Sequence, residues 1–239
     1  MDVELADGVT VVRIDHPPVN AIDQALVDEA VATVRGIEGP IVLTGAGKCF
    51  SAGVDLRAII DGPPEDTDRF LAAVSDAFLA VFDHPAPVVA AINGHAIAGG
   101  CVIAMAADVR LMSAGLIGLS EVAVGVPFPV AALEICRYAM GPSVTRAVLQ
   151  ADNVDVQTAA ERGWIDEVAA PEDLRGRAVE VARALGQHPA TGYAVMKEQL
   201  HRHAREAINE GTELDANVRA IWKSDETRAR ISAFLDALK

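Results

Sequence analysis

The feature that most constrains the fold is a long stretch without formal charge, residues 85–107, which is interrupted by helix-breaking residues. An unbroken run of this length would suit a membrane-spanning helix. The interruptions are Pro85, Pro87, Asn93-Gly94 and Gly99-Gly100. Because these residues favour turns, the stretch predicts a buried strand at Val88–Ile92, a turn, and a short buried helix at Gly100–Ala107.

The same order of strand, glycine-containing loop and helix occurs elsewhere along the chain, which predicts an α/β fold with loops that meet at one site. Further strands are expected at Val9–Ile14, Ile41–Thr44, Val109–Met112 and Asp166–Ala169. Helices are expected at Gln24–Arg35, Thr67–Asp83, Ala131–Ala139, Ser143–Gln150 with Ser143 as its cap, and Val156–Arg162.

The C-terminal part of the sequence reads as a helical tail. Its expected helices are Glu172–Leu185, Thr191–Glu210, Thr212–Ser224 and Asp225–Leu238. A boundary near Gln187–Pro189 would divide a core, residues 1–187, from a helical region, residues 188–239. No flexible linker precedes this region, so we expect it to pack on the core or on a neighbouring subunit.

Composition excludes some partners. A net charge of −14 and a pI near 4.7 argue against binding to nucleic acid or to an anionic membrane surface. The three cysteines, Cys49, Cys101 and Cys136, lack paired spacing, and the acidic start MDVELADG does not resemble a signal peptide. We therefore expect a cytoplasmic protein.

Several familiar motifs are absent. The glycine loop after Ile41–Thr44 lacks a Walker pattern, because Val42 stands where the first glycine is needed and no Ser or Thr follows Lys48. Phe50 replaces the third glycine of a dinucleotide fingerprint, and no Gly-x-Ser-x-Gly elbow occurs. Glu198, His201 and His203 have no second cluster to complete a zinc site and are expected on a solvated helix face. For His95, lining a site and being buried with a hydrogen bond remain alternatives.

Two glycine-containing loops remain, FSAGVD at Phe50–Asp55 and HAIAGGC at His95–Cys101. Each follows a buried strand and opens a helix, where unpaired backbone N–H groups favour an anion or oxyanion. With HPPVNAI, VLTGAGKCFSAGVDL and IGLSEVAVGVP, they make the chain resemble the crotonase superfamily, also called the enoyl-CoA hydratase/isomerase family, over nearly its whole length.

The resemblance implies an α/β fold built as a crotonase-like spiral of ββα units with a C-terminal helical trimerisation region. It also implies an acyl-CoA thioester substrate, no metal, no cofactor beyond the coenzyme A of the substrate, and a homotrimer or homohexamer. The matching oxyanion donors are the N–H groups of Val54 and Gly99. Further substrate contacts are expected from Ala52, Asp55, Leu56, Arg57, Gly100 and Lys197, with Lys48 as a third cationic candidate.

The glutamate pattern separates the reactions of this family. Hydratases of the family commonly use two glutamates; Glu121 matches the second, whereas Val102 stands at the position of the first. Hydration needs both a base and an acid, whereas moving a double bond from C3 to C2 needs a single base that returns its proton. The chain therefore resembles the Δ3,Δ2-enoyl-CoA isomerase branch, with Glu121 as acid and base in apolar surroundings that would raise its pKa. A hydratase with an acid from elsewhere and a non-catalytic acyl-CoA-binding protein remain alternatives.

Other carboxylates are candidates for a second acid. Asp61, Glu65, Asp66 and Asp68 lie in a Pro/Gly-rich segment that we expect to be a solvated turn. Glu134 lies in an apolar helix and either faces the site or pairs with Arg137 or Arg110, and Asp108 is expected to be structural. The depth of an acyl site would depend on Phe70, Phe78, Phe128 and the tail.

Overall fold

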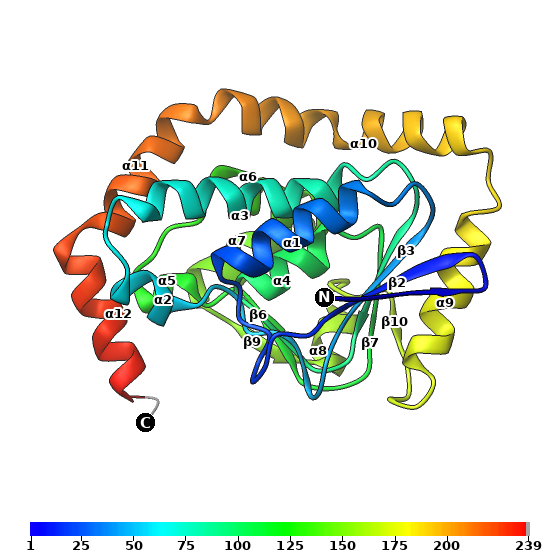
Figure 1. Cartoon of the computed structure of the whole chain (residues 1–239), viewed down its shortest axis with the longest axis horizontal. Coiled ribbons are helices and arrows are strands. Elements are labelled where there is room, and N and C mark those ends of the chain that lie inside the picture. The colour runs from blue at the N-terminus through cyan, green and yellow to red at the C-terminus, as the bar shows by residue number, and fades with distance from the viewer. Residues whose placement is uncertain (238–239) are drawn as a thin grey trace.

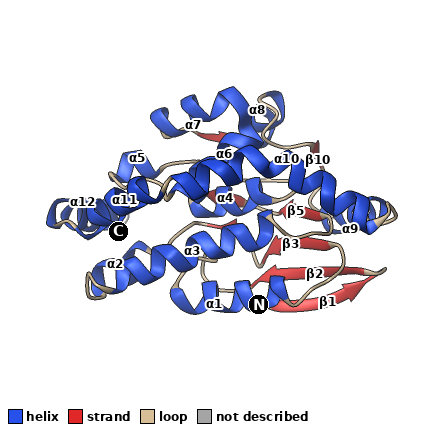
Figure 2. Cartoon of the chain, turned by 90° about the horizontal axis from the view of Figure 1, so that it is seen from above, coloured by secondary structure: helices blue, strands red, loops and turns tan. Residues whose placement is uncertain are grey.

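The five predicted strands and a sixth, β1, form one sheet with the order β1-β2-β3-β5-β7-β10, in a computed structural model that describes residues 1–237 (Figure 1). All neighbouring strands are parallel except β1, which pairs antiparallel with β2. Figure 2 shows β1, β2, β3 and β5 in this order. The strands are β1 (Asp2–Ala6), β2 (Val9–Ile14), β3 (Ile41–Gly45), β5 (Val88–Ile92), β7 (Val109–Met112) and β10 (Glu167–Val168).

A second, smaller sheet has the order β4-β6-β8-β9. Its strands are β4 (Cys49–Ser51), β6 (His95–Ile97), β8 (Leu116–Gly118) and β9 (Asn153–Asp155). β4, β6 and β8 each follow a strand of the first sheet after a short turn, and a helix follows each of them. The chain therefore repeats ββα units. The individual short strands were not predicted, because three residues are too few to show a period of two.

The central strands are buried on both faces. Along β3, Val42 contacts the cluster of α9 (Leu174–Leu185), while Leu43 belongs to the main core with α1 (Gln24–Arg35) and α3 (Asp66–Phe82). On β5, Val89 likewise belongs to the α9 cluster and Ala90 to the main core. Burial on both faces is typical of parallel sheets, whose strands consequently lack polar alternation.

The remaining helices of the core surround the ends of the short strands. They are α2 (Leu56–Asp61), α4 (Gly99–Ala106), α5 (Glu121–Val124), α6 (Val130–Met140), α7 (Val144–Gln150) and α8 (Val156–Glu161). Ser143 is the N-cap residue of α7, as predicted, but its side chain makes no capping hydrogen bond: its Oγ donates to the Met140 carbonyl and accepts from Trp164 Nε1, both at 2.8 Å.

The tail folds back over the core. α10 (Ala190–Glu210) runs along the top of Figure 1, and α11 (Thr212–Lys223) and α12 (Asp225–Ala237) descend toward α2. The predicted end of the last helix, Leu238, lies outside the described residues. The division into residues 1–187 and 188–239 stays a prediction; α10 begins at Ala190, close to that boundary. No helix within residues 1–237 is both long and apolar enough to cross a membrane.

Candidate active site

A cavity of about 230 Å³ lies where the loops after β4, β6 and β8 meet the tail. Its wall is mostly apolar, and the side chains of Ser120 and Glu121 are its polar exceptions among the described residues. The lining residues are Ala52, Val54, Leu56, Leu71, Val74, Phe78, Ile97, Ala98, Gly99, Val102, Ser120, Glu121, Val124, Val126, Pro127, Phe128, Pro129, Ala132, Trp222 and Phe234. The structure thus brings the two glycine loops and Glu121 to one cavity.

The backbone around Val54 leaves its N–H free. The N–H of Ile22 donates to the Gly53 carbonyl at 2.8 Å, and the N–H of Asp55 donates to the Ile22 carbonyl at 2.9 Å. Because N–H groups alternate in direction along extended backbone, the Val54 N–H points away from Ile22. No backbone hydrogen bond found in residues 1–237 uses this N–H as donor.

The second loop supplies a matching donor. Gly99 is the first residue of α4, so its N–H has no acceptor within the helix. Gly53 has φ +84° and lies directly against this position: a Cβ atom added to Gly53 would be 2.9 Å from the Gly99 nitrogen. The two loops are therefore in close backbone contact, and only glycine fits at Gly53.

The turn into α4 is strained. Ala98 has φ +54°, a conformation that costs a non-glycine residue about 1–3 kcal/mol. Gly100 lies behind the cavity instead of lining it, because a Cβ at this position would be 2.2 Å from the Ser51 carbonyl oxygen. The expected substrate contact of Gly100 is therefore not seen; its role here is close packing of α4 on β4.

Glu121 begins α5, and its carboxyl lines the cavity. Its Oε2 atom is buried and has no hydrogen-bond partner among the described residues. Burial raises the pKa of this carboxyl to about 8, although backbone groups of Glu121 and Ser120 act in the opposite direction. The carboxyl can consequently hold or release a proton near neutral pH.

Val102 lines the same cavity and is completely buried on α4. The position where hydratase-type sequences carry a first glutamate is therefore part of an apolar wall. The carboxylate of Glu121 stands without a second one in the lining formed by residues 1–237.

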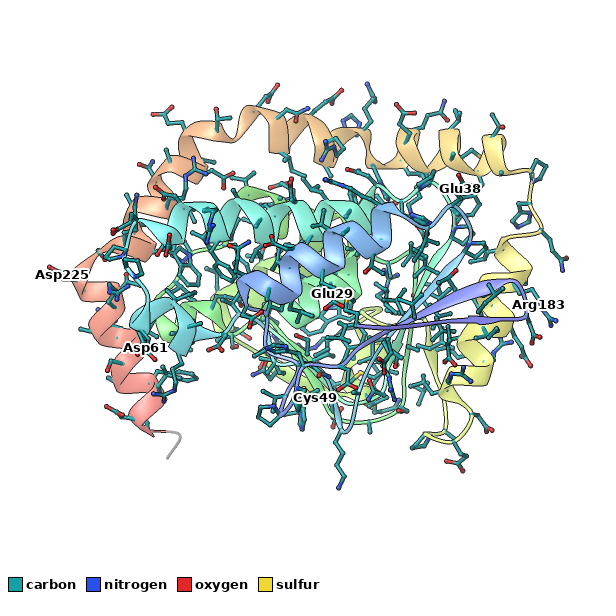
Figure 3. The ribbon with its side chains drawn as sticks, in the orientation of Figure 1. Glu29, Glu38, Cys49, Asp61, Arg183 and Asp225 are labelled. Atoms are coloured by element: carbon teal, nitrogen blue, oxygen red, sulfur yellow. The ribbon has the colours of Figure 1, made fainter. Side chains whose placement is uncertain are left out.

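The other candidate acids lie elsewhere. Asp61 and Glu65 are exposed, and Figure 3 shows Asp61 at the same end of the molecule as Asp225. Asp68 accepts a hydrogen bond from Lys223 Nζ at 2.7 Å. Glu134 pairs with Arg137 at 3.2 Å, as one alternative predicted.

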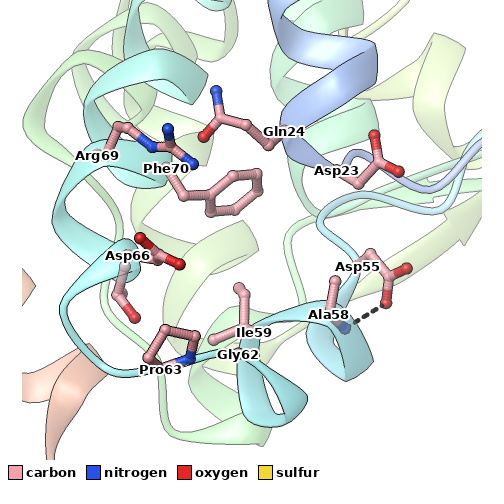
Figure 4. A pocket seen from close by; sticks show the side chains of 11 residues that line it. Asp23, Gln24, Asp55, Ala58, Ile59, Gly62, Pro63, Asp66, Arg69 and Phe70 are labelled. Atoms are coloured by element: carbon pink, nitrogen blue, oxygen red, sulfur yellow. Dashed lines mark hydrogen bonds between the residues drawn. The ribbon is translucent and has the colours of Figure 1, made fainter.

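Asp66 and Phe70 line a different cavity, of about 150 Å³, between α1, α2 and α3 (Figure 4). Asp55 lines it too, and its Oδ1 accepts hydrogen bonds from the N–H groups of Arg57 and Ala58. Asp55 therefore caps α2 instead of facing the larger cavity.

The predicted coenzyme A contacts are only partly brought together. Ala52 and Leu56 line the larger cavity, and Arg57 is exposed on the adjoining helix α2. Lys48 is exposed in the turn before β4. Lys197 lies apart: its side chain is on the buried side of α10, and its Nζ pairs with Asp108 at 2.8 Å. The structure therefore does not place Lys197 at this cavity, and it confirms Asp108 as a structural residue.

The histidines do not form a site. His201 is buried and stacks on Phe82 with ring centroids 3.6 Å apart, so the expectation of a solvated face was wrong for this residue. His95 is exposed and accepts from the Leu116 N–H through Nδ1 at 3.2 Å, which matches neither alternative. Residues 1–237 contain no cluster of His, Cys, Asp and Glu that could hold a metal ion.

The tail was expected to shape the acyl site, but its lining residues were not identified from the sequence. Trp222 of α11 is buried, lines the cavity, and its Nε1 donates to the Pro127 carbonyl at 2.8 Å. Phe234 of α12 lies nearby in the same lining. A tryptophan on the apolar side of an amphipathic tail helix was the available signal, but it does not say which surface the helix covers.

The fold and the two backbone loops define a crotonase-type protein. The family model for enoyl-CoA hydratase/isomerase matches residues 4–239, and the chain belongs to this family, whose members act on acyl-CoA thioesters. A putative enoyl-CoA hydratase of Thermus thermophilus is 31% identical over 223 residues, covering 89% of this chain and 85% of the relative.

Solved structures agree on the fold. An enoyl-CoA isomerase of Mycobacterium tuberculosis superposes with a TM-score of 0.83 and 30% identity, covering 90% of this chain and 97% of the other. The human mitochondrial Δ3,Δ2-enoyl-CoA isomerase gives a TM-score of 0.93 at 23% identity, covering 99% and 96%. The predicted α/β crotonase-like fold with C-terminal helices is thus confirmed.

Proposed function

We propose that this chain moves the double bond of a 3-enoyl-CoA to C2, with Glu121 as the single acid and base. The observation that carries the proposal is a carboxyl with a buried, unpartnered oxygen, the one carboxyl in the lining that residues 1–237 give to an apolar cavity, beside two backbone N–H groups without an acceptor in the same residues. The N–H groups of Val54 and Gly99 are the proposed oxyanion hole.

The reaction needs no further acid. The Glu121 carboxylate removes a proton from C2, and the electron pair moves into the C1–C2 bond while the thioester oxygen becomes an oxyanion. The N–H groups of Val54 and Gly99 stabilise this charge. Glu121 then returns the same proton to C4, the C3–C4 double bond becomes C2–C3, and the carbonyl re-forms. Atoms and electrons balance without water.

Backbone donors suit this task because they are fixed before the charge develops. Loss of one such donor typically lowers the rate about a hundredfold to a thousandfold. The close contact between Gly53 and Gly99 and the strained turn at Ala98 support a preorganised pair of donors.

The rest of the cavity favours a hydrocarbon acyl group. Phe78, Phe128 and Trp222 contribute aromatic surface, and most of the remaining lining is aliphatic. A polar substituent on the acyl chain would lose its hydration without gaining a partner. We therefore propose that the substrate has an unsubstituted hydrocarbon tail.

A hydratase is the second candidate, because the Thermus relative carries that name. Water addition would need an acid besides Glu121, and Ser120 is the other polar side chain in the lining formed by the described residues. A serine hydroxyl is too weak an acid to protonate a carbon near neutral pH. The geometry therefore favours isomerisation.

The test offers the purified protein 3-enoyl-CoA and 2-enoyl-CoA of several chain lengths. Double-bond position is followed by ultraviolet absorbance, and water addition by a mass increase of the thioester. We expect conversion of 3-enoyl-CoA without hydration. Hydration of 2-enoyl-CoA at a comparable rate would contradict the proposal, and tight binding without turnover would indicate a non-catalytic acyl-CoA-binding protein.

We further propose a homotrimer or homohexamer that acts in the cytoplasm, since members of the family are oligomeric. The oligomeric state follows from the molar mass in solution, measured by light scattering during size-exclusion chromatography. A monomer at micromolar concentration would contradict the assembly.

A further inference from the structure

Ser51, the last residue of β4, is completely buried and does not line the cavity. Its hydroxyl is both a hydrogen-bond donor and an acceptor. Oγ donates to the Asn20 carbonyl at 2.7 Å and accepts from the Gly53 N–H at 3.2 Å. The side chain therefore connects the segment before α1 with the first glycine loop.

The same residue contacts the second loop through its backbone. A Cβ added to Gly100 would lie 2.2 Å from the Ser51 carbonyl oxygen and 2.9 Å from Ser51 Cβ. Ser51 also pairs with Ala96 of β6 in the parallel register of the small sheet. It consequently touches the residue before one proposed donor and the residue after the other.

The acceptor of the Ser51 hydroxyl is itself fixed. Asn20 is 2% exposed, and its Nδ2 donates to the Cys49 carbonyl at 2.8 Å and the Ala46 carbonyl at 3.1 Å. Its Oδ1 accepts from the His16 N–H at 2.9 Å. The hydroxyl of Ser51 is thus held by a rigid partner, and it can hold Gly53 in turn.

We propose that Ser51 is a positioning residue for the oxyanion hole. Its hydroxyl fixes Gly53 at φ +84°, the conformation that turns the Val54 N–H away from Ile22, while its backbone sets the spacing to α4. This inference rests on the proposed oxyanion hole, but not on which reaction follows.

Ser51→Ala tests it, because the substitution removes both hydrogen bonds and little volume. Ser143→Ala is the matched control: this hydroxyl also donates to a carbonyl and accepts from an N–H, both at 2.8 Å, but its partners, Met140 and Trp164, belong to neither glycine loop. The probe is 2,4-hexadienoyl-CoA, whose absorption moves to longer wavelength when its thioester carbonyl is polarised by hydrogen bonds.

We expect Ser51→Ala to bind the probe with a Kd close to the wild-type value but with a smaller wavelength shift. Its kcat for 3-enoyl-CoA should fall about tenfold to a hundredfold with little change in KM, because a displaced donor loses part of its effect on the transition state. Ser143→Ala should keep the full shift and kcat, whatever its loss of thermal stability.

A folded Ser51→Ala with a wild-type shift and kcat would overturn the inference. If this variant does not fold, Ser51→Cys keeps the shape of the side chain with a somewhat larger atom and weaker hydrogen bonding, and it should show an intermediate shift; a full shift would overturn the inference. A wild-type protein that shifts the probe but does not isomerise 3-enoyl-CoA would overturn the proposed reaction alone. A bound probe without any shift in the wild type would overturn both the oxyanion hole and the role of Ser51.

Discussion

Two buried ionisable sites in this chain differ in how their charges are satisfied. Where α10 packs on the core, its Lys197 pairs with Asp108 at 2.8 Å, and Asp108 also accepts from the Val88 N–H at 2.8 Å. At the cavity, the Glu121 carboxyl leaves one buried oxygen without a partner among the described residues. Both sites are costly to bury, but only the first is compensated inside the protein.

The pKa values show the same contrast. Burial lowers the pKa of Lys197, and the neighbouring Asp108 carboxylate opposes this. Burial raises the pKa of Glu121 to about 8, and within residues 1–237 it is opposed by backbone groups of Glu121 and Ser120 instead of a cation. A compensated buried charge supports structure, whereas an uncompensated carboxyl at a cavity is available to a substrate.

The largest expected effect comes from removing the uncompensated carboxyl. Glu121→Gln should lower kcat for isomerisation about a hundredfold to ten-thousandfold, because no other carboxylate in the described lining can move the proton. The fold should be retained, as circular dichroism would check. Glu134→Gln is the matched control, since Glu134 pairs with Arg137 outside this cavity. Equal losses in the two variants would contradict the role of Glu121.

Removing the cation of the compensated site should instead affect stability. Lys197→Met leaves the largely buried Asp108 carboxylate without its cation, which should lower the free energy of unfolding by about 3–5 kcal/mol. Urea unfolding measures this change. KM for acyl-CoA, measured well below the unfolding temperature, should not change, because Lys197 does not line the cavity. A raised KM with unchanged stability would restore Lys197 as a coenzyme A contact.

The sequence predicted those features of the two sites and of the fold that depend on local sequence pattern. The bounds of α1, β5 and β7 agree with the prediction, since apolar periodicity and turn residues specify them. The cavity position of Val54, Gly99 and Glu121 followed from motif resemblance. The positions of Lys197 and Trp222 did not, because they depend on where the tail folds back, and a helix pattern does not encode its packing partner.

The ionisation of Glu121 gives a pH dependence with a definite sign. In the proposed reaction the carboxylate is the active base, and with a pKa of about 8 most of it is protonated at pH 7. We expect kcat/KM to rise about tenfold per pH unit below pH 8 and to level off above it. Steady-state rates between pH 5.5 and 9 would check this. A profile that is flat from pH 5.5 upward would mean that Glu121 is ionised in the free protein.

The same ionisation should work against folding. The pKa of Glu121 is higher in the folded protein than its ordinary value of 4.5, so the folded state binds more protons between these values. Its stability contribution is full below pH 4.5 and is lost as the pH rises through 8. Glu121→Gln should therefore gain stability relative to the wild type between pH 5 and pH 8, in paired urea titrations; a constant difference would contradict a raised pKa.

The smallest expected effect concerns a second ion pair of a lysine and an aspartate. Its N–O distance is nearly equal to that of Lys197 and Asp108, but it is more exposed. Lys223 and Asp68 are 2.7 Å apart, with side chains 34% and 46% exposed, against 6% and 15% for Lys197 and Asp108. Water screens the more exposed pair, so Lys223→Met should lower the free energy of unfolding by about 1 kcal/mol or less. Urea titrations run beside Lys197→Met compare the two directly. If both substitutions lowered the free energy of unfolding by the same amount, burial would not explain a difference between the two ion pairs. The contrast between Asp108 and Glu121 would then need another cause.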